Sequence, residues 1–320
     1  MNPSNKNDIE VSVVCTTYNH IGYIEQCLKS LVSQETSFPY EVIVHDDCST
    51  DGTTEMVKRF AAEHSDKVVL FLETENQYSK GVNMRELFRP YIRGKYVAIC
   101  EGDDWWIDSR KLQRQFDYME SHPEAAACAH AARRFVDSEK RFETILAPAD
   151  DERDFTTGDL IAFGDNIATN SFFYRSELHF MPDAYNGWGV GDYPASIYLS
   201  TCGTFHYSPE VMSVYRVGVK GSWSSRMAAS TEANVKAQRR IIGGLETFDR
   251  YTGGRYHEYV ANAVNDREVT IAVLRRDFKA VKDNARYGTY PLAKRLALWL
   301  RCANPRLAAN LQKRLSGGIG

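Results

Sequence analysis

The sequence YVAICEGDDWW, residues 96–106, decides the fold class that we expect for this chain. It begins as an apolar run typical of a buried strand and ends in three carboxylates, Glu101, Asp103 and Asp104. Carboxylates this close repel one another, and a hard cation such as Mg²⁺ or Mn²⁺ would offset their charge at the edge of an apolar core. Because such cations commonly bridge to phosphates, the stretch predicts phosphate chemistry at a strand tip. The alternative is a solvated acidic turn that leads into the next helix.

Strands alternate with helical patterns through the first hundred residues. The runs typical of strands are 11–17, 41–45, 68–72 and 96–100, and the segments between them carry apolar residues at helical spacing. This order predicts an α/β fold with a Rossmann-like, mostly parallel central sheet, helices on both faces and right-handed crossovers. In such open sheets the ligand lies beyond the carboxyl ends of the strands.

Polar residues follow three of these strands. TTYN at 16–19 follows the first strand, DDCS at 46–49 the second and EGDD at 101–104 the fourth. A Thr hydroxyl and an Asp carboxylate can hydrogen-bond the edge of a base, a Tyr ring can stack on it, and the acidic cluster can hold a metal on the phosphates. The three clusters therefore predict a nucleotide site. Neither a P-loop NTPase nor a Rossmann dehydrogenase is supported, since both glycine-rich signatures are missing.

Composition narrows the class of protein further. A net charge of −3 gives no bias toward nucleic acid. The first ten residues lack the apolar core of a signal peptide, and no run of about 18 apolar residues exists to span a bilayer, so we expect a cytoplasmic protein. The seven cysteines are odd in number and form no C-x-x-C pair, which argues against a disulfide framework or a structural zinc site.

Four segments together resemble the family 2 glycosyltransferases with the GT-A fold. They are VSVVCTTYN at 11–19, HDDCSTDGT at 45–53, GKYVAICEGDDWW at 94–106 and GDYP at 191–194. The resemblance implies inverting transfer of a sugar from a nucleoside diphosphate sugar, most often a UDP-sugar, to an acceptor hydroxyl. It also implies a hexosyl- or N-acetylhexosaminyltransferase that acts in polysaccharide or glycoconjugate synthesis.

The same resemblance implies roles for individual residues at the donor site. Those implied to contact the nucleoside are Thr16, Tyr18 and Asp47. Asp103, with Glu101 or Asp104 beside it, would hold Mn²⁺ or Mg²⁺ on the diphosphate. Many relatives carry Asp where this chain has Glu101, and Glu reaches about one methylene further, so we rank Asp103 above Glu101 as a direct ligand.

Inverting transfer also needs a base opposite the metal to take the proton of the acceptor hydroxyl. Asp192 is the candidate because it follows a glycine-rich loop, 187–191, and opens a helix, as the catalytic Asp of the family does. Asp183 and Asp165 do not combine these two features. The alternative for Asp192 is a purely structural helix N-cap.

Later aromatic and basic residues have two interpretations each. Arg216, Lys220 and Trp223 are expected diphosphate or lid contacts, with an ordinary surface loop as the alternative. Trp105 and Trp106 form either a wall for the sugar or part of the core.

The pattern becomes helical toward the C-terminus, so we expect a GT-A domain at 1–225 and a helical extension at 226–320. Residues 285–320 carry seven Lys or Arg and no Asp or Glu, interleaved with Leu and Trp. This pattern predicts peripheral contact with the inner face of an anionic membrane, which would suit a lipid-linked glycan acceptor. The alternatives are a helix packed on the core or on the second subunit of a homodimer.

Two other functions remain open at this point. A sugar nucleotidyltransferase would use a similar metal site, but it would carry glycine and arginine in its N-terminal loop, and residues 11–19 contain neither. A non-catalytic nucleotide- or glycan-binding module would tolerate the loss of Asp192.

Overall fold

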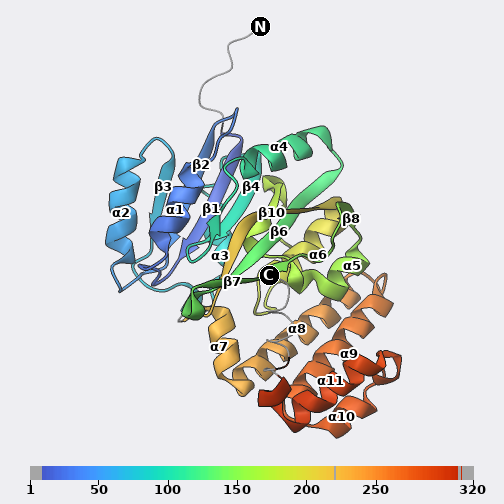
Figure 1. Ribbon diagram of the computed structural model, residues 1–320. Coiled ribbons are helices and arrows are strands. Elements are labelled where there is room, and N and C mark those ends of the chain that lie inside the picture. Colours follow the sequence, from blue (N-terminus) through green and yellow to red (C-terminus); the bar gives the residue numbers. More distant parts are fainter. Residues whose placement is uncertain (1–8, 220, 309–310, 312–320) are drawn as a thin grey trace.

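The computed structural model of the protein describes residues 9–219, 221–308 and 311 (Figure 1). Lys220 and the last residues of the basic tail lie outside this part of the chain. The strands are β1 Val11–Thr17, β2 Tyr40–Asp46, β3 Val68–Leu72, β4 Tyr96–Glu101, β5 Trp105–Trp106, β6 Ala125–Val136, β7 Arg141–Leu146, β8 Arg153–Phe155, β9 Phe173–Arg175 and β10 Thr204–Val217. The helices are α1 Ile24–Val32, α2 Thr53–Glu63, α3 Met84–Phe88, α4 Lys111–Ser121, α5 Thr157–Phe163, α6 Asp192–Cys202, α7 Trp223–Ala229, α8 Thr231–Tyr251, α9 His257–Leu274, α10 Phe278–Asp283 and α11 Leu292–Ala303.

The strands form one sheet in the order β3-β2-β1-β4-β9-β6-β10-β5, with β7 beside β6 and β8 beside β10. The first four strands along this order are parallel, and β6 and β10 are parallel to each other. The short β9 joins the two parallel groups by antiparallel pairing with β4 and β6. This arrangement confirms the expected α/β fold with a mostly parallel sheet.

The sheet carries a hydrophobic core on each face. Val13 and Val14 are neighbours in β1 yet belong to different core clusters, because successive side chains of a strand point to opposite faces. Leu28 of α1 and Val57 of α2 belong to the same cluster as Val13, and Ile197 of α6 belongs to the cluster of Val14 on the opposite face. Burial on both faces fits the apolar centres of these strands, residues 13–15 in β1 and 42–44 in β2, and most of the polar residues beside them are buried as well.

The C-terminal helices lie below the carboxyl edge of the sheet in Figure 1. Leu245 and Phe248 of α8 and Val260 of α9 belong to the same core cluster as the sheet. Helices α10 and α11 instead share a small core of their own with the end of α9. The boundary expected at 225/226 falls inside α7 and stays a prediction. Among the described residues, no helix has the length and apolar content needed to cross a membrane.

Candidate active site

The tips of β1, β2 and β4 bring the three predicted polar clusters together. In the parallel register Thr16 lies between His45 of β2 and Glu101 of β4. The backbone N–H of Gly102 donates to the carbonyl oxygen of Thr16 at 2.8 Å, and that of Asp47 donates to the carbonyl oxygen of Thr17 at 3.0 Å. Hydrogen bonds between backbone groups therefore fix the three loops relative to one another.

The loop that carries Tyr18 is held by Asn19, which adopts a left-handed conformation with φ 56°. The Asn19 N–H donates to Ser49 Oγ at 2.8 Å, and its Oδ1 accepts from the N–H of Thr50 at 2.8 Å. Asn tolerates this backbone conformation better than most residues. The loop leaves the Tyr18 side chain 45% exposed, so its ring is accessible to a ligand.

Asp47 is buried and orders the loop that follows β3. Its Oδ1 accepts from the N–H of Gln77 at 2.7 Å, and its Oδ2 accepts from the N–H of Tyr78 at 3.1 Å. The expected nucleoside contact of Asp47 would therefore also depend on residues 77–78, which the sequence analysis did not single out.

The acidic motif divides into residues with different surroundings. Burial, together with repulsion from Asp103 and Asp192, raises the pKa of Glu101 to about 8. Asp104 is fully buried, whereas Glu101 is partly exposed. The Oδ1 of Asp104 accepts from the N–H of Arg216 at 2.7 Å, and its Oδ2 accepts from Asn170 Nδ2 at 2.8 Å. Both oxygens of Asp104 are thus used in positioning strand β10, which favours Glu101 and Asp103 over Asp104 as metal ligands.

Glu101 and Asp103 fit a divalent cation by their charge. The raised pKa of Glu101 reflects a partly buried carboxylate whose negative charge neighbouring carboxylates repel, which is the condition that Mg²⁺ or Mn²⁺ would relieve. In the described part of the chain, no three His, Cys, Asp or Glu side chains are grouped so that they could hold a metal. An open site suits these cations, which often keep waters and substrate phosphates among their ligands.

Asp192 belongs to the same electrostatic cluster, although it lies far along the chain. It is the first residue of α6, and the N-cap of that helix is Gly191. Its Oδ1 accepts from the N–H of Tyr193 at 2.8 Å, and its Oδ2 accepts from Thr169 Oγ1 at 3.4 Å. The charge of Asp192 contributes to the raised pKa of Glu101, which indicates that the predicted base lies near the predicted metal ligands.

Arg216 has a different environment from the one expected. Its guanidinium is buried: Nε donates to the carbonyl oxygen of Asp103 at 2.7 Å, Nη2 donates to Gln26 at 2.8 Å, and the group lies 4.5 Å from the ring centre of Trp105. Arg216 thus supports the acidic loop from inside the protein. The expected diphosphate contact stays a prediction, and this geometry does not favour it.

The two tryptophans of the motif are both buried, in agreement with the core alternative. Trp106 donates its indole N–H to the carbonyl oxygen of Asn170 at 3.0 Å. Asn170 therefore links Trp106, Asp104 and β10. No motif in the sequence indicates this structural role.

Tyr215 is a site residue that the sequence analysis missed. Burial raises its pKa, and so do four neighbouring carboxylates, those of Glu101, Asp104, Asp192 and Asp103. The side chain of Tyr215 therefore lies within the electrostatic field of the acidic cluster. The only signal in the sequence was its position directly before Arg216 at the end of a strand.

Trp223 begins α7, a helix whose N-cap is Ser222. Arg226 in the same helix places its guanidinium 5.7 Å from the ring centre of Tyr78, the residue that Asp47 holds. Helix α7 therefore reaches the loops of the predicted nucleoside site, and Trp223 is partly exposed there.

A mostly parallel sheet with helices on both faces and acidic residues at a strand tip, followed by further helices, is the architecture of GT-A glycosyltransferases. The sequence model of glycosyl transferase family 2 matches residues 12–180, more than half of the chain, and the protein belongs to that family. Both the expected fold and the expected family are confirmed.

Three known proteins illustrate the similarity. An uncharacterized protein of Mycobacterium tuberculosis is 34% identical over 221 residues, which are 67% of this chain and 61% of that protein. The chain thus spans about three fifths of the length of this relative. The structure of Staphylococcus aureus TarS 1-349 with UDP-GlcNAc has a TM-score of 0.54 at 17% identity and covers 92% of this chain and 79% of that one. The mannosyltransferase PcManGT of Pyrobaculum calidifontis, solved with GDP-Man and Mn²⁺, has a TM-score of 0.52 at 18% identity and covers 95% and 88%.

Proposed function

We propose that the protein is an inverting glycosyltransferase that moves a sugar from a nucleoside diphosphate sugar to an acceptor hydroxyl. The observation that carries this proposal is the shared electrostatic environment of Glu101 and Asp103, at the tip of β4, and of Asp192, at the start of α6. Acidic groups for a metal and an acidic group for proton transfer are the two requirements of a metal-assisted single displacement.

On the donor side, Thr16, Tyr18 and Asp47 would bind the nucleoside. The exposed Tyr18 ring supports stacking on a base. Both carboxylate oxygens of Asp47 already accept backbone N–H groups, so its part in nucleoside binding would be made together with the loop at residues 77–78. TarS was solved with UDP-GlcNAc, and we propose a UDP-sugar as the donor here, with a hexosyl or N-acetylhexosaminyl group transferred. Trp223 on α7 would cover the bound donor.

Glu101 and Asp103 would hold Mn²⁺ or Mg²⁺ against the diphosphate. When bound, the cation would neutralise the charge that develops on the leaving diphosphate. Arg216 and Asn170 would support the metal site without binding the metal. Arg216 fixes the backbone of Asp103 and Asn170 fixes the carboxylate of Asp104, and together they hold the acidic loop in place.

Asp192 would act as the base. It takes the proton of the acceptor hydroxyl as the oxygen forms its bond to the anomeric carbon, while the bond from that carbon to the diphosphate breaks on the opposite face. The Tyr193 N–H orients one carboxylate oxygen of Asp192, and Thr169 orients the other.

The test is transfer by Asp192→Asn with Asp183→Asn as the matched control from the same region. We expect Asp192→Asn to lower the rate about 10²-fold or more while donor binding is retained, and Asp183→Asn to remain close to the wild type. A near wild-type rate for Asp192→Asn, or a loss confined to Asp183→Asn, would show that the base is assigned wrongly.

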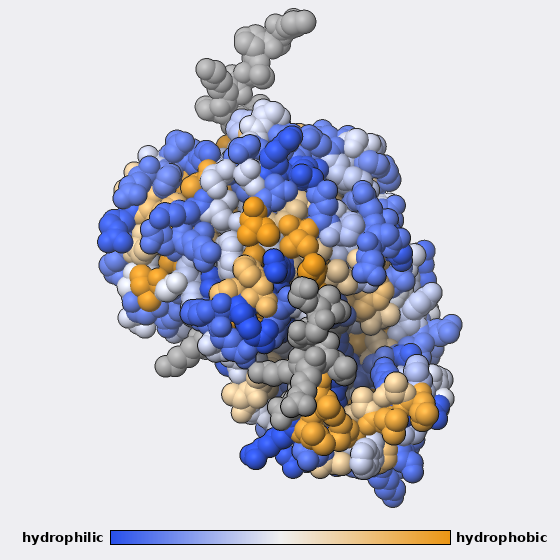
Figure 2. Space-filling view, in the orientation of Figure 1, coloured by the Kyte–Doolittle hydropathy of each residue, from blue (hydrophilic) through white to orange (hydrophobic). Residues whose placement is uncertain are grey.

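We also propose that the acceptor is a glycan or lipid-linked glycan reached at the inner face of a membrane. Three residues spaced along one stripe of α11 are exposed: Leu292 by 72%, Leu296 by 58% and Trp299 by 49%. Lys294 and Arg295 lie between them. Figure 2 shows hydrophobic residues gathered at the lower end of the molecule, where Figure 1 places the last helices.

An apolar stripe bordered by cations is typical of helices that lie on anionic lipid surfaces. Sedimentation with phosphatidylglycerol vesicles tests this, with Leu296→Glu/Trp299→Glu compared with Ile145→Glu, an exposed apolar residue on β7. Loss of vesicle binding only in the α11 variant is expected. A change in oligomeric state without a change in vesicle binding would instead assign the stripe to a homodimer.

A further inference from the structure

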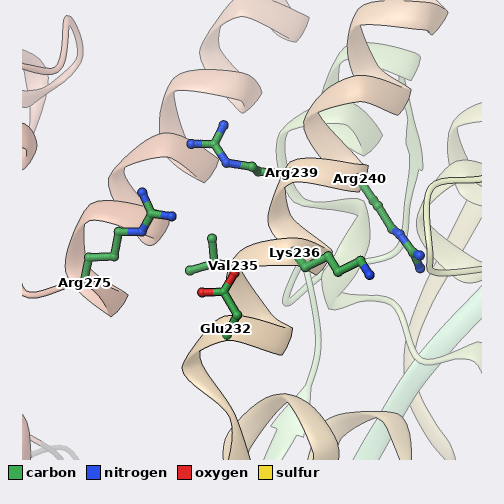
Figure 3. A pocket seen from close by; sticks show the side chains of 6 residues that line it. All are labelled: Glu232, Val235, Lys236, Arg239, Arg240 and Arg275. Carbon is green, nitrogen blue, oxygen red and sulfur yellow. The ribbon is translucent and has the colours of Figure 1, made fainter.

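Helix α8 and the end of α9 border a second polar region, separate from the strand tips. Its hollow has a volume of about 340 Å³ (Figure 3). The residues that line it are Glu232, Val235, Lys236, Arg239, Arg240 and Arg275. Four of the six are cations and none is aromatic. Neutral sugars are commonly held against aromatic rings, and this lining offers no such ring.

The positive charge of this hollow is largely uncompensated. Glu232 is the one carboxylate in the lining. Arg239 Nη1 lies 3.7 Å from Glu268 Oε1, but both side chains are about half exposed, so water screens the pair. Lys236, Arg240 and Arg275 form no ion pair with any carboxylate in the ranges that the structure describes. A concave surface with excess cations concentrates anions from solution.

The hollow adjoins the loop that presents Asp192. Gly189 has φ +81°, and a Cβ there would lie 3.1 Å from Arg240 Cδ, so the arginine stem packs directly on the loop. One turn further along α8, the ring of Trp188 lies against Gly244. Asp192 follows Gly189 by three residues. A single short loop thus separates the proposed base from Arg240 at the edge of the hollow, whereas the proposed donor contacts are made by the strand-tip loops.

We infer that the α8 hollow binds the part of the acceptor chain beyond the reacting hydroxyl, and that this chain carries repeated phosphodiester or carboxylate groups. The inference rests on the proposed function, since an acceptor is defined by transfer at Asp192. The flat guanidinium groups of Arg239, Arg240 and Arg275 can each donate two parallel hydrogen bonds to a phosphate or carboxylate. Cations on two helices fit an extended polyanion better than a single small ion.

The experiment measures binding of a poly(glycerol phosphate) oligomer, with a dextran oligomer of equal length as the neutral probe. Lys236→Glu/Arg275→Glu reverses two charges of the hollow without touching the Gly189 loop. Arg250→Glu/Lys279→Glu is the matched control, because it reverses two exposed cations elsewhere on α8 and α10. We expect the first variant to bind the polyanion roughly ten-fold more weakly, the control to match the wild type, and added salt to reduce the difference.

Calorimetric titration with UDP and Mn²⁺ runs in parallel on every variant. If UDP fails to bind the wild type while the polyanion still binds through the hollow, the proposed function fails and the anion site stands. If both variants bind the polyanion equally, or the wild type binds dextran as tightly, the inference is wrong. If Lys236→Glu/Arg275→Glu loses binding to phosphatidylglycerol vesicles but still binds the polyanion like the wild type, the inference is also wrong, because the hollow would then be a membrane contact.

Discussion

Replacing Glu101 by Gln tests the electrostatics of the candidate site through the stability of the metal-free protein. Gln imitates a protonated glutamate, so the variant lacks the partly buried negative charge. The pKa of Glu101 is raised from an ordinary 4.5 to about 8, which means that the folded protein holds a proton that the unfolded chain has lost between these values. The free energy of unfolding contributed by this group is therefore fully present below pH 4.5 and is lost as the pH rises through 8.

The size of the effect follows from the two pKa values. Each pKa unit corresponds to about 1.36 kcal/mol, so a difference of roughly 3.5 sets an upper bound of about 5 kcal/mol. Partial access of water to the site reduces this, and we expect Glu101→Gln to be more stable than the wild type by about 2–4 kcal/mol at pH 9. At pH 4 the two proteins are expected to be equally stable.

Both proteins are unfolded with urea in the presence of EDTA at pH values from 4 to 9. The quantity compared is the difference between their free energies of unfolding at each pH. Titrating groups whose pKa does not depend on Glu101, such as His20, occur in both proteins and cancel in that difference. Glu63→Gln, on the exposed face of α2, is the control and should show no pH-dependent difference. Adding Mn²⁺ at pH 8 should stabilise the wild type more than Glu101→Gln. A difference that stays flat with pH, or that favours the wild type at pH 9, would refute the reasoning.

Three further changes have expected outcomes. Asn170→Ala removes hydrogen bonds to Asp104 and β10 and should lower the free energy of unfolding by about 2–3 kcal/mol in urea titrations; an unchanged midpoint would contradict the role given to this amide. Gly102→Ala places a Cβ 2.8 Å from Thr17 Oγ1, so we expect the acidic loop to shift and Mn²⁺-dependent nucleotide binding to weaken at least ten-fold by calorimetry, and unchanged affinity would refute this. Tyr215→Phe should lower kcat about ten-fold with little change in the urea midpoint; an equal kcat would remove Tyr215 from the site.

The first four strands could be predicted from the sequence because they are buried on both faces. A strand such as β2, Tyr40–Asp46, is buried along its whole length, and its apolar centre, residues 42–44, is the local signal of a strand covered on both faces. The second half of the sheet could not be predicted in this way. β9 has three residues and pairs with two strands distant in the sequence, so no local pattern reports it.

The candidate site was predictable where a sequence motif suggests chemistry. Asp103 and Asp192 were singled out because they stand in segments that resemble family 2 glycosyltransferases, and their roles stay predictions. Asp104 and Arg216 show the limit of such reasoning, since their roles depend on partners that lie about 110 residues apart in the chain. Tyr215 was missed because a tyrosine in a strand is most often a core residue.

The most direct test of the central claim is calorimetric titration with UDP, GDP, CDP and dTDP, each with and without Mn²⁺. Asp103→Ala is compared with Asp66→Ala, an exposed aspartate away from the site. The account predicts that UDP binds selectively, that Mn²⁺ raises its affinity at least ten-fold, and that Asp103→Ala alone loses this enhancement. Failure of all four diphosphates to bind in the presence of Mn²⁺, or equal binding by Asp103→Ala, would contradict it.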